Sequence, residues 1–226
     1  MPFTARFTDG RLFAAPLGKI VCVGRNYAEH ARELNNPVPS APLLFIKPAS
    51  AAVALETPLE AQFARGEVHF ETELALLIGK SLTAATPDQA ARAVAGLGLA
   101  LDLTLRDVQS RLKEKGHPWE IAKAFDGACP LSAFAPVTGE IDWQALHFSL
   151  DIDGERRQSG DAGDMLFAIP ELLAAMSRHF TLEPGDVVLT GTPAGVGVLP
   201  RGAELRLQLA EGAGHGGVEA VTRTAA

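Results

Sequence analysis

The most informative pattern in the chain is an apolar run at residues 68–80 that is interrupted by two acids. Its β-compatible composition and the closing Gly79-Lys80 pair predict a β-strand. Glu71 and Glu73 are two positions apart, so in a strand they share one face and lie about 7 Å apart. Carboxylates this close repel and raise each other's pKa. Either this face is solvated, or a hard divalent cation lies between the two side chains.

A second apolar run, at residues 95–105, contains a single charged residue, Asp102. An ionised carboxylate is costly to bury in such a strand unless it is paired or binds a metal. The alternative is a strand end or a helix N-cap, because a helical pattern follows. Together with Glu71 and Glu73, Asp102 would form a three-carboxylate site with coordination positions left open for water and substrate.

Alternating residues and turn signals predict the other elements. Asp153-Gly154 is a type I′ turn signal within a hairpin, and Thr86-Pro87 starts a helix that extends to about residue 94. Asn26 is expected to cap a helix at 27–34. Further strands are expected at 19–23, 42–48, 146–152, 186–190, 200–209 and 218–222, and further helices at 110–115 and at 165–180 with Pro170 in its first half.

The helix expected at 27–34 carries a histidine and a glutamate on one face. His30 and Glu33 are three positions apart, so their side chains are neighbours on a helix. A carboxylate beside an imidazole holds its tautomer and raises its basicity, as in a general base. The same spacing also arises by chance on exposed amphipathic helices. Proline and asparagine follow at 35–42, which favours a movable lid.

Four further polar residues are candidates for a place beside the carboxylates. Arg106 and Gln109 are three positions apart and would face the site together, or would both be solvated. Lys123 lies between two alanines, which leave room for a ligand to approach. Alternatively, the Lys123 side chain is solvated and takes no part in the site. A buried Lys123 would be paired with the carboxylates and would stabilise an enolate. Lys47, at a strand end, is expected to be solvated.

A glycine-rich segment, GTPAGVG, follows the strand expected at 186–190. Residues 191–197 lack the Gly-Lys-Ser/Thr ending of a P-loop and the spacing of a dinucleotide fingerprint. The backbone N–H groups of this segment would bind a carboxylate, unless the segment is simply a tight connection.

Composition and charge narrow the class of protein. The 226 residues are 47% hydrophobic, which allows a full core. The net charge of −7 argues against nucleic acid or an anionic membrane as the main partner. Cys22 and Cys129 are expected to be buried free thiols. Without a leader pattern or an apolar run of about 18 residues, we expect a soluble cytoplasmic protein, with a lead-in at 1–16 and one domain at 17–226.

Six segments, taken together and in this order, resemble the fumarylacetoacetate hydrolase family. They are GRNYAEHARE (24–33), LLFIKP (43–48), HFETELALLIGK (69–80), LDLTLRDVQ (101–109), PWEIAKAFDGACPLS (118–132) and GDVVLTGTPAGVG (185–197). The likeness is strongest to the small branch of acylpyruvases and of oxaloacetate decarboxylases or tautomerases. It implies an α+β, β-rich fold, namely a mixed β-sandwich roll with a few peripheral helices, and a homodimer.

The resemblance also implies roles for individual residues. The implied ligands of Mg2+ or Mn2+ (Ca2+ can substitute in a crystal) are Glu71, Glu73 and Asp102. The implied catalytic residues are His30, Glu33 and Lys123, and the implied substrate-binding residues are Arg25, Arg106, Gln109, Gly191 and Thr192. Many relatives have His-His-Glu where this chain has His69-Phe70-Glu71. Phe70 replaces the second histidine of these relatives, so any role of that histidine has no counterpart in this chain. The implied metal ligands are unaffected.

These observations lead us to expect a metal-dependent hydrolase that cleaves a C–C bond in a small 2,4-dioxo acid, an acylpyruvate such as acetylpyruvate or fumarylpyruvate. The Glu33–His30 pair would activate a water, and the metal and Lys123 would stabilise the departing pyruvate enolate. Two alternatives use the same site: decarboxylation of oxaloacetate, and keto–enol tautomerisation of oxaloacetate or a 2-hydroxydienoate. A metal-binding protein without turnover is a more remote alternative.

Overall fold

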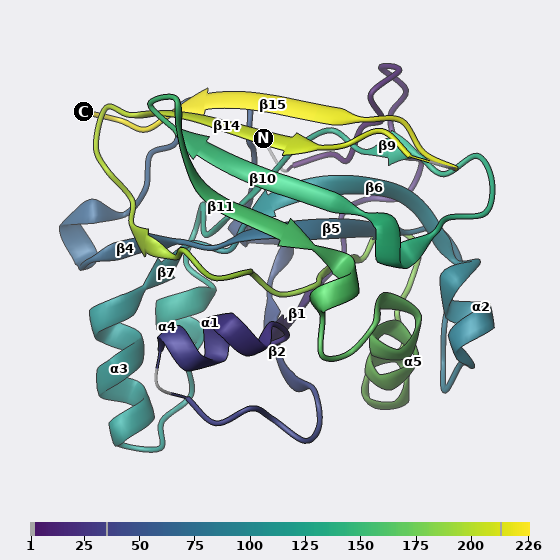
Figure 1. Ribbon diagram of the computed structural model, residues 1–226, viewed down its shortest axis with the longest axis horizontal. Helices are drawn as coiled ribbons and strands as arrows, with labels where there is room; N and C mark the ends of the chain where they lie inside the picture. The colour runs from purple at the N-terminus through teal and green to yellow at the C-terminus, as the bar shows by residue number, and fades with distance from the viewer. Residues whose placement is uncertain (1–2, 35, 213) are drawn as a thin grey trace.

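The protein is mostly β, with one curled eight-stranded sheet at its centre and short helices around it (Figure 1). The computed structural model describes residues 3–34, 36–212 and 214–226. The strands of the large sheet are β1 (Ile20–Gly24), β2 (Leu43–Lys47), β3 (Ala52–Ala54), β5 (Thr72–Ile78), β6 (Val94–Leu101), β8 (Cys129–Leu131), β9 (Ala135–Pro136) and β12 (Val187–Leu189). Their order is β2-β1-β12-β5-β6-β8-β3, and β9 also pairs with β6.

Two smaller sheets complete the roll. The four-stranded sheet, in the order β11-β10-β14-β15, lies over β5 and β6 (Figure 1). The three-stranded sheet has the order β13-β4-β7. The strands of these two sheets are β4 (Val68–Phe70), β7 (Thr104–Leu105), β10 (His147–Ile152), β11 (Glu155–Asp161), β13 (Gly197–Val198), β14 (Glu204–Leu209) and β15 (Val218–Arg223). This architecture confirms the predicted β-rich roll.

The helices lie at the periphery of the sheets (Figure 1). They are α1 (Ala28–Glu33), α2 (Pro87–Ala91), α3 (Arg106–Glu114), α4 (Glu120–Lys123) and α5 (Ile169–His179), with short 3-10 turns η1 (Ala49–Ala51), η2 (Phe63–Arg65), η3 (Trp143–Ala145) and η4 (Ala162–Asp164). Among the described residues, no helix has the length and apolar character needed to cross a bilayer. Strands supply most of the core, and α5 adds buried residues such as Leu172 and Met176.

The core is centred on β5, in which all seven residues are buried. A strand covered on both faces reads as a continuous apolar run, as residues 74–78 of β5 do after Thr72 and Glu73. β5 pairs with β12 on one side and β6 on the other. The predicted free thiols, Cys22 on β1 and Cys129 on β8, are both buried in this core. Burial raises the pKa of the Cys129 thiol to about 12.

The strand predicted at residues 68–80 is divided in two. β4 ends at Phe70 and β5 begins at Thr72, with Glu71 between them. The physical reason is a change of sheet, because β4 pairs with β13 and β7 whereas β5 pairs with β12 and β6. Similarly, the strand predicted at 95–105 ends at Leu101 before Asp102, and the two residues of β7 belong to the smaller sheet.

Of the two helix N-caps predicted from the sequence, Thr86 is observed and Asn26 is not. Thr86 starts α2 as predicted and forms a capping box with Gln89, although α2 ends at Ala91 rather than at residue 94. Asn26 does not cap α1, because the N-cap is Tyr27 and has no side-chain bond. The Asn26 amide instead donates to the carbonyl oxygens of Phe167 and Thr190, at 3.1 and 2.9 Å. Asn26 therefore joins two distant loops.

Two other predicted helices have different bounds. α3 begins at Arg106, four residues before the predicted start. α5 begins at Ile169 rather than residue 165, with Pro170 in its first turn. Proline is tolerated there because the N–H groups of the first turn have no acceptor within the helix, so the absence of one breaks no hydrogen bond. The predicted turn at Asp153-Gly154 is confirmed, since both residues have positive φ angles, of 50° and 82°. Asn35, at the start of the expected lid connection, lies outside the described residues.

Candidate metal centre and active site

The three predicted carboxylates meet at one end of the β5–β6 pair. These strands are antiparallel, and Thr72 pairs with Leu101, so the start of β5 adjoins the end of β6. The Asp102 N–H donates to the Glu71 carbonyl oxygen at 2.8 Å. All three carboxylates are buried, and one oxygen of each lies within 4.8 Å of those of the others: Glu71, Glu73 and Asp102. Sheet pairing thus brings together acids 31 positions apart along the chain.

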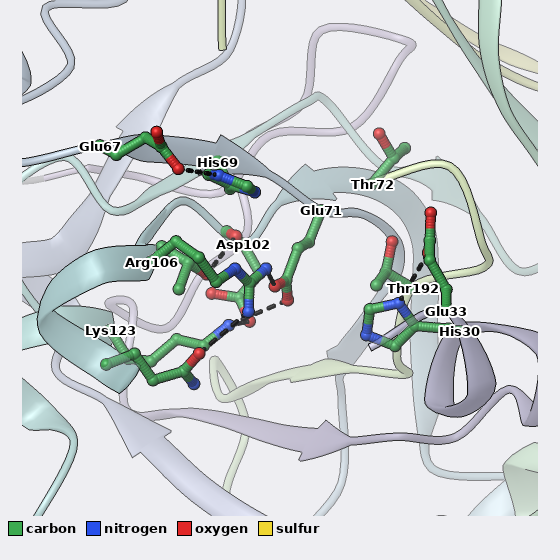
Figure 2. Close-up of polar contacts among 12 residues, drawn as sticks. His30, Glu33, Glu67, His69, Glu71, Thr72, Asp102, Arg106, Lys123 and Thr192 are labelled. Carbon is green, nitrogen blue, oxygen red and sulfur yellow. Dashed lines mark hydrogen bonds and ion pairs between the residues drawn. The ribbon is translucent and has the colours of Figure 1, made fainter. Parts of the chain in front are cut away.

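Lys123, on α4, points into this cluster (Figure 2). Its Nζ donates to Glu71 Oε2 at 2.9 Å and to Asp102 Oδ2 at 2.7 Å. Burial favours the neutral amine, but the charges of Asp102 and Glu71 outweigh burial and raise the pKa of Lys123. Lys123 is therefore a charged ammonium group, and the alternative of a solvated side chain is wrong.

Lys47 is a second buried ammonium, which contradicts the expectation that it is solvated. The side chain is fully buried, and its Nζ lies 2.8 Å from Asp102 Oδ1. It also donates to the carbonyl oxygens of Lys123 and Ala128. The signal for this position is the strand period, because Lys47 shares a face of β2 with Phe45, which lines the cavity described below.

Arg106 and Gln109 lie together on α3, as their spacing predicts. Arg106 forms an ion pair with Glu71 and donates from Nη1 to Gln109 Oε1 at 2.9 Å. Burial alone would raise the pKa of Glu71, but the charges of Lys123 and Arg106 lower it below the ordinary value. Glu71 is therefore held as a carboxylate.

Glu73 differs from its two neighbours because it has no cationic partner among the described residues. Its Oε2 accepts one hydrogen bond, from the Gly191 N–H at 2.6 Å. Burial, together with the charges of Asp102 and Glu71, raises the pKa of Glu73 well above its usual range. A divalent cation among the three carboxylates would supply the missing charge, and carboxylate oxygens suit Mg2+ and Mn2+. The donor set therefore fits a divalent metal ion.

His30 faces the cluster from the other side of a cavity, and Glu33 lies beside His30 but does not line that cavity (Figure 2). His30 is buried, and its Nδ1 lies 3.5 Å from Glu33 Oε2. Burial lowers the pKa of His30 below 6.5, although the charge of Glu71 partly opposes the shift. The imidazole is therefore uncharged at neutral pH.

The glycine-rich segment binds two carboxylates, and both belong to the protein itself. The Gly191 N–H donates to Glu73, and the Gly195 N–H lies 3.2 Å from each carboxylate oxygen of Glu33. Both glycines have positive φ angles, of 95° and 96°. A Cβ atom on Gly191 would lie 2.7 Å from that of Asn26, so only glycine fits there. These N–H groups therefore bind side-chain carboxylates of the protein, and Gly191, expected to bind substrate, does not line the cavity described below.

The cavity between the carboxylate cluster and His30 has a volume of about 50 Å³. It has room for a few water molecules or a small organic acid. Thr192 lines it, and the Thr192 hydroxyl accepts a hydrogen bond from Gln158 Nε2 at 2.8 Å. Sequence analysis missed Gln158, which is buried on β11 and also accepts the Thr72 N–H. The other predicted residues that line the cavity are Arg25, His30, Glu71, Glu73, Asp102, Arg106, Gln109 and Lys123.

A buried carboxylate cluster that fits a divalent metal, inside a β-sandwich roll, defines a class of metal-dependent enzymes. The chain belongs to the fumarylacetoacetate hydrolase family. The family model described as fumarylacetoacetate (FAA) hydrolase C-terminal matches residues 19–219. This assignment confirms the resemblance inferred from the sequence motifs.

Three relatives illustrate the activities in this family. The chain is 53% identical to the oxaloacetate tautomerase YcgM of Escherichia coli (strain K12), over 87% of this chain and 90% of that protein. It is 41% identical to the mitochondrial oxaloacetate decarboxylase of Dictyostelium discoideum, over 83% and 87%. The crystal structure of fumarylpyruvate hydrolase from Pseudomonas aeruginosa, in complex with Mn2+ and pyruvate, matches with a TM-score of 0.87 and 37% identity, over 99% of this chain and 96% of that chain.

Proposed function

We propose that this protein is a divalent-metal-dependent oxaloacetate tautomerase, which interconverts the keto and enol forms of oxaloacetate. The relative from Escherichia coli, at 53% identity, supports this reaction more strongly than the fumarylpyruvate hydrolase, at 37%, supports C–C hydrolysis. Of the activities expected from the sequence, the alternative therefore has better support than the main expectation.

The observation that carries the proposal is an uncharged His30 across a small cavity from a cluster of cations. Tautomerisation moves a proton between carbon and oxygen, so it needs a base that is neutral at the working pH. A proton on Nδ1, which lies 3.5 Å from Glu33 Oε2, would leave Nε2 to take the proton from C3 of the substrate and deliver it to the enolate oxygen, with the reverse path giving the keto form. No water molecule has to be activated.

The opposite wall of the cavity stabilises negative charge. Lys123 and Arg106 hold positive charge beside Glu71, where the oxygen of an enolate would develop. Glu71, Glu73 and Asp102 would hold Mg2+ or Mn2+, which supplies Lewis-acid polarisation of the 2-oxo acid when bound. One wall of the cavity therefore supplies the base, His30, and the opposite wall supplies the cations Lys123 and Arg106.

The charges of the cluster favour a dianionic substrate. The three carboxylates are matched by Lys47, Lys123 and Arg106, so their charges cancel. A divalent cation would leave the centre with a net charge of +2. Oxaloacetate and fumarylpyruvate each carry two carboxylates, whereas acetylpyruvate carries one, so the charge of the loaded centre matches the dicarboxylic acids, oxaloacetate among them.

The test is to follow the enol absorbance of oxaloacetate as it approaches equilibrium, with Mg2+, with Mn2+ and with a chelator. We expect acceleration only with metal, and a loss of about 10²–10⁴-fold in His30→Gln because the base is removed. Acetylpyruvate is assayed in parallel for pyruvate release. Metal-dependent cleavage of acetylpyruvate without faster enol–keto exchange of oxaloacetate would establish a hydrolase instead.

Decarboxylation of oxaloacetate is the second candidate, and the Dictyostelium relative favours it. Loss of CO2 leaves an enolate that Lys123 and Arg106 would stabilise in the same way, but the step needs no base. The two reactions therefore respond differently to His30→Gln. Decarboxylation should persist in this variant, measured as pyruvate release, whereas enol–keto exchange should be lost.

A further inference from the structure

We propose that Lys113 and Arg25 bind the second carboxylate of the substrate and make the site selective for dicarboxylic 2-oxo acids over acids that end in an uncharged group. The proposal rests on the proposed function, because it assigns the far end of the same cavity. Both residues line that cavity. Lys113 is exposed and Arg25 is half-buried, so they lie on its solvent side.

The first support is the geometry of α3. Arg106, Gln109 and Lys113 are spaced by three and four residues, so they share one face of the helix, and all three line the cavity. At a rise of 1.5 Å per residue, Lys113 lies about 10 Å along the axis from Arg106. Arg106 is bound to Glu71 at the inner end. The cavity face of α3 therefore presents one cation beside the carboxylate cluster and another near solvent.

The second support is that the cations on the solvent side have no anionic partner. Over residues 3–34, 36–212 and 214–226, neither Arg25 nor Lys113 forms an ion pair. The Lys113 ammonium donates only to Asn36 Oδ1, at 3.3 Å. By contrast, Arg111 on the same helix pairs with Asp107 at 3.0 Å. Among the described residues, Lys113 is thus the cation of α3 that lines the cavity without an anionic partner.

Arg25 and Lys113 line the same cavity, so their positive charges repel each other. Partial burial, with the charges of Arg25 and Arg106, lowers the pKa of Lys113. A carboxylate bound between Lys113 and Arg25 would relieve this repulsion and form charge-assisted hydrogen bonds with both. The two cations therefore form an anion-binding end of the cavity.

The third support is the backbone of Arg25. Its φ angle is +60°, in the left-handed region that disfavours residues with a side chain. Such conformations are retained at functional sites where the surrounding structure imposes them. Arg25 connects β1 to the start of α1, next to Asn26, whose side chain makes three hydrogen bonds to two other segments. The strained turn holds the Arg25 side chain at the cavity.

Among the residues that the structure describes, the walls between the two ends offer no competing anionic group on the solvent side. Leu34, Leu43, Phe45 and Trp119 line the cavity along with the polar residues. The three carboxylates in the lining are those of the metal cluster, at the inner end. A ligand with an anionic group at each end therefore fits the charge distribution along the cavity.

The experiment compares a matched pair of ligands in equilibrium binding to the Mn2+-loaded protein. Lactate and malate share the 2-hydroxy acid group that chelates a metal, but only malate has a second carboxylate. We expect Lys113→Met to weaken malate binding about tenfold, as loss of one charge-assisted contact predicts, and to leave lactate unchanged. Lys113→Arg should restore malate binding. In Lys115→Met, which removes an exposed charge outside the cavity, both affinities should equal those of the wild type.

Kinetics with oxaloacetate separates this proposal from the proposed function. Lys113→Met should raise KM about tenfold with little change in kcat. Equal malate affinity in the wild type and Lys113→Met, or an equal loss for malate and lactate, would overturn the assignment even if oxaloacetate is tautomerised. If the wild type does not tautomerise oxaloacetate but Lys113→Met selectively loses malate, the dicarboxylate site stands and the proposed reaction fails.

Discussion

Lys47 is the residue that most clearly joins stability to the candidate metal centre. Its ammonium lies against Asp102 and two backbone carbonyl oxygens and has no exposed surface. It does not line the cavity. We therefore assign it a positioning role, in which it holds Asp102 in place and compensates its charge.

Replacing Lys47 tests this role. Lys47→Met should lower the free energy of unfolding by about 3–5 kcal/mol, because it leaves a buried carboxylate and two carbonyl groups with fewer partners. Urea denaturation provides the measurement. The control is Lys80→Met, an exposed position, where a change within about 0.5 kcal/mol is expected. A Lys47→Met protein as stable as the control would show that the ion pair contributes nothing.

Glu73→Gln separates metal binding from folding. The amide keeps the shape of the side chain and an oxygen that accepts the Gly191 N–H, but it removes a charge that burial and two carboxylates disfavour. Because the pKa of Glu73 is raised on folding, its contribution to stability is lost as pH increases through that pKa. At pH 7 the metal-free variant should thus be at least as stable as the metal-free wild type.

The same variant should no longer bind the metal tightly. We expect the melting temperature of Glu73→Gln to be unchanged by Mn2+ that stabilises the wild type, and activity to be lost with it. Thermal denaturation with and without Mn2+, together with the metal content after gel filtration, provides the measurement. Wild-type Mn2+ affinity in Glu73→Gln would remove Glu73 from the ligand set.

At the scale of elements, the capping box of α2 is the clearest local signal. Thr86 accepts the Gln89 N–H, and the Gln89 side chain accepts the Thr86 N–H in return. Thr86→Ala should cost about 1 kcal/mol of stability, measured by denaturation. Since α2 packs on α5 rather than on the cavity, activity at saturating substrate should be unchanged. A loss of activity without a loss of stability would contradict this assignment.

The sequence predicts local starts and turns better than the paths of strands. The Thr86 cap and the Asp153-Gly154 turn depend on neighbouring residues, so they are recognised directly. Glu71 and Glu73 were predicted to be neighbours within one strand. They are indeed neighbours, but Glu71 lies at a change of sheet, which depends on pairing with strands far along the chain. The burial of Lys47 likewise depends on contacts more than 50 residues away.

At the scale of the whole molecule, the candidate metal centre lies at the end of the most buried strands. β5 and β6 form the middle of the large sheet, and their adjoining ends carry Glu73 and Asp102. Local pattern predicted these acids, and the resemblance to the family implied the class of fold. It could not predict the order of strands, for example the parallel pairing of β1 with β12, because that order follows from contacts across most of the chain.

Metal binding should therefore stabilise the entire fold. At a free Mn2+ concentration of 100 times Kd, the free energy of unfolding should rise by about 2.7 kcal/mol. For a chain of this size, that corresponds to an increase in melting temperature of about 5–10 °C. Differential scanning calorimetry over a range of Mn2+ concentrations provides the measurement. A melting temperature independent of Mn2+, when binding is verified separately, would mean that the ion binds the unfolded chain equally well.

The glycine-rich connection after β12 contacts both the metal cluster and the His30–Glu33 pair. Within five residues, Gly191 fixes Glu73 beside the metal cluster and Gly195 fixes Glu33 beside the base. This connection therefore sets the distance between two parts of the site, the metal cluster and the His30–Glu33 pair. A substitution that shifts it would displace both parts together, so metal affinity and proton transfer should decline in parallel across a series of variants in this segment.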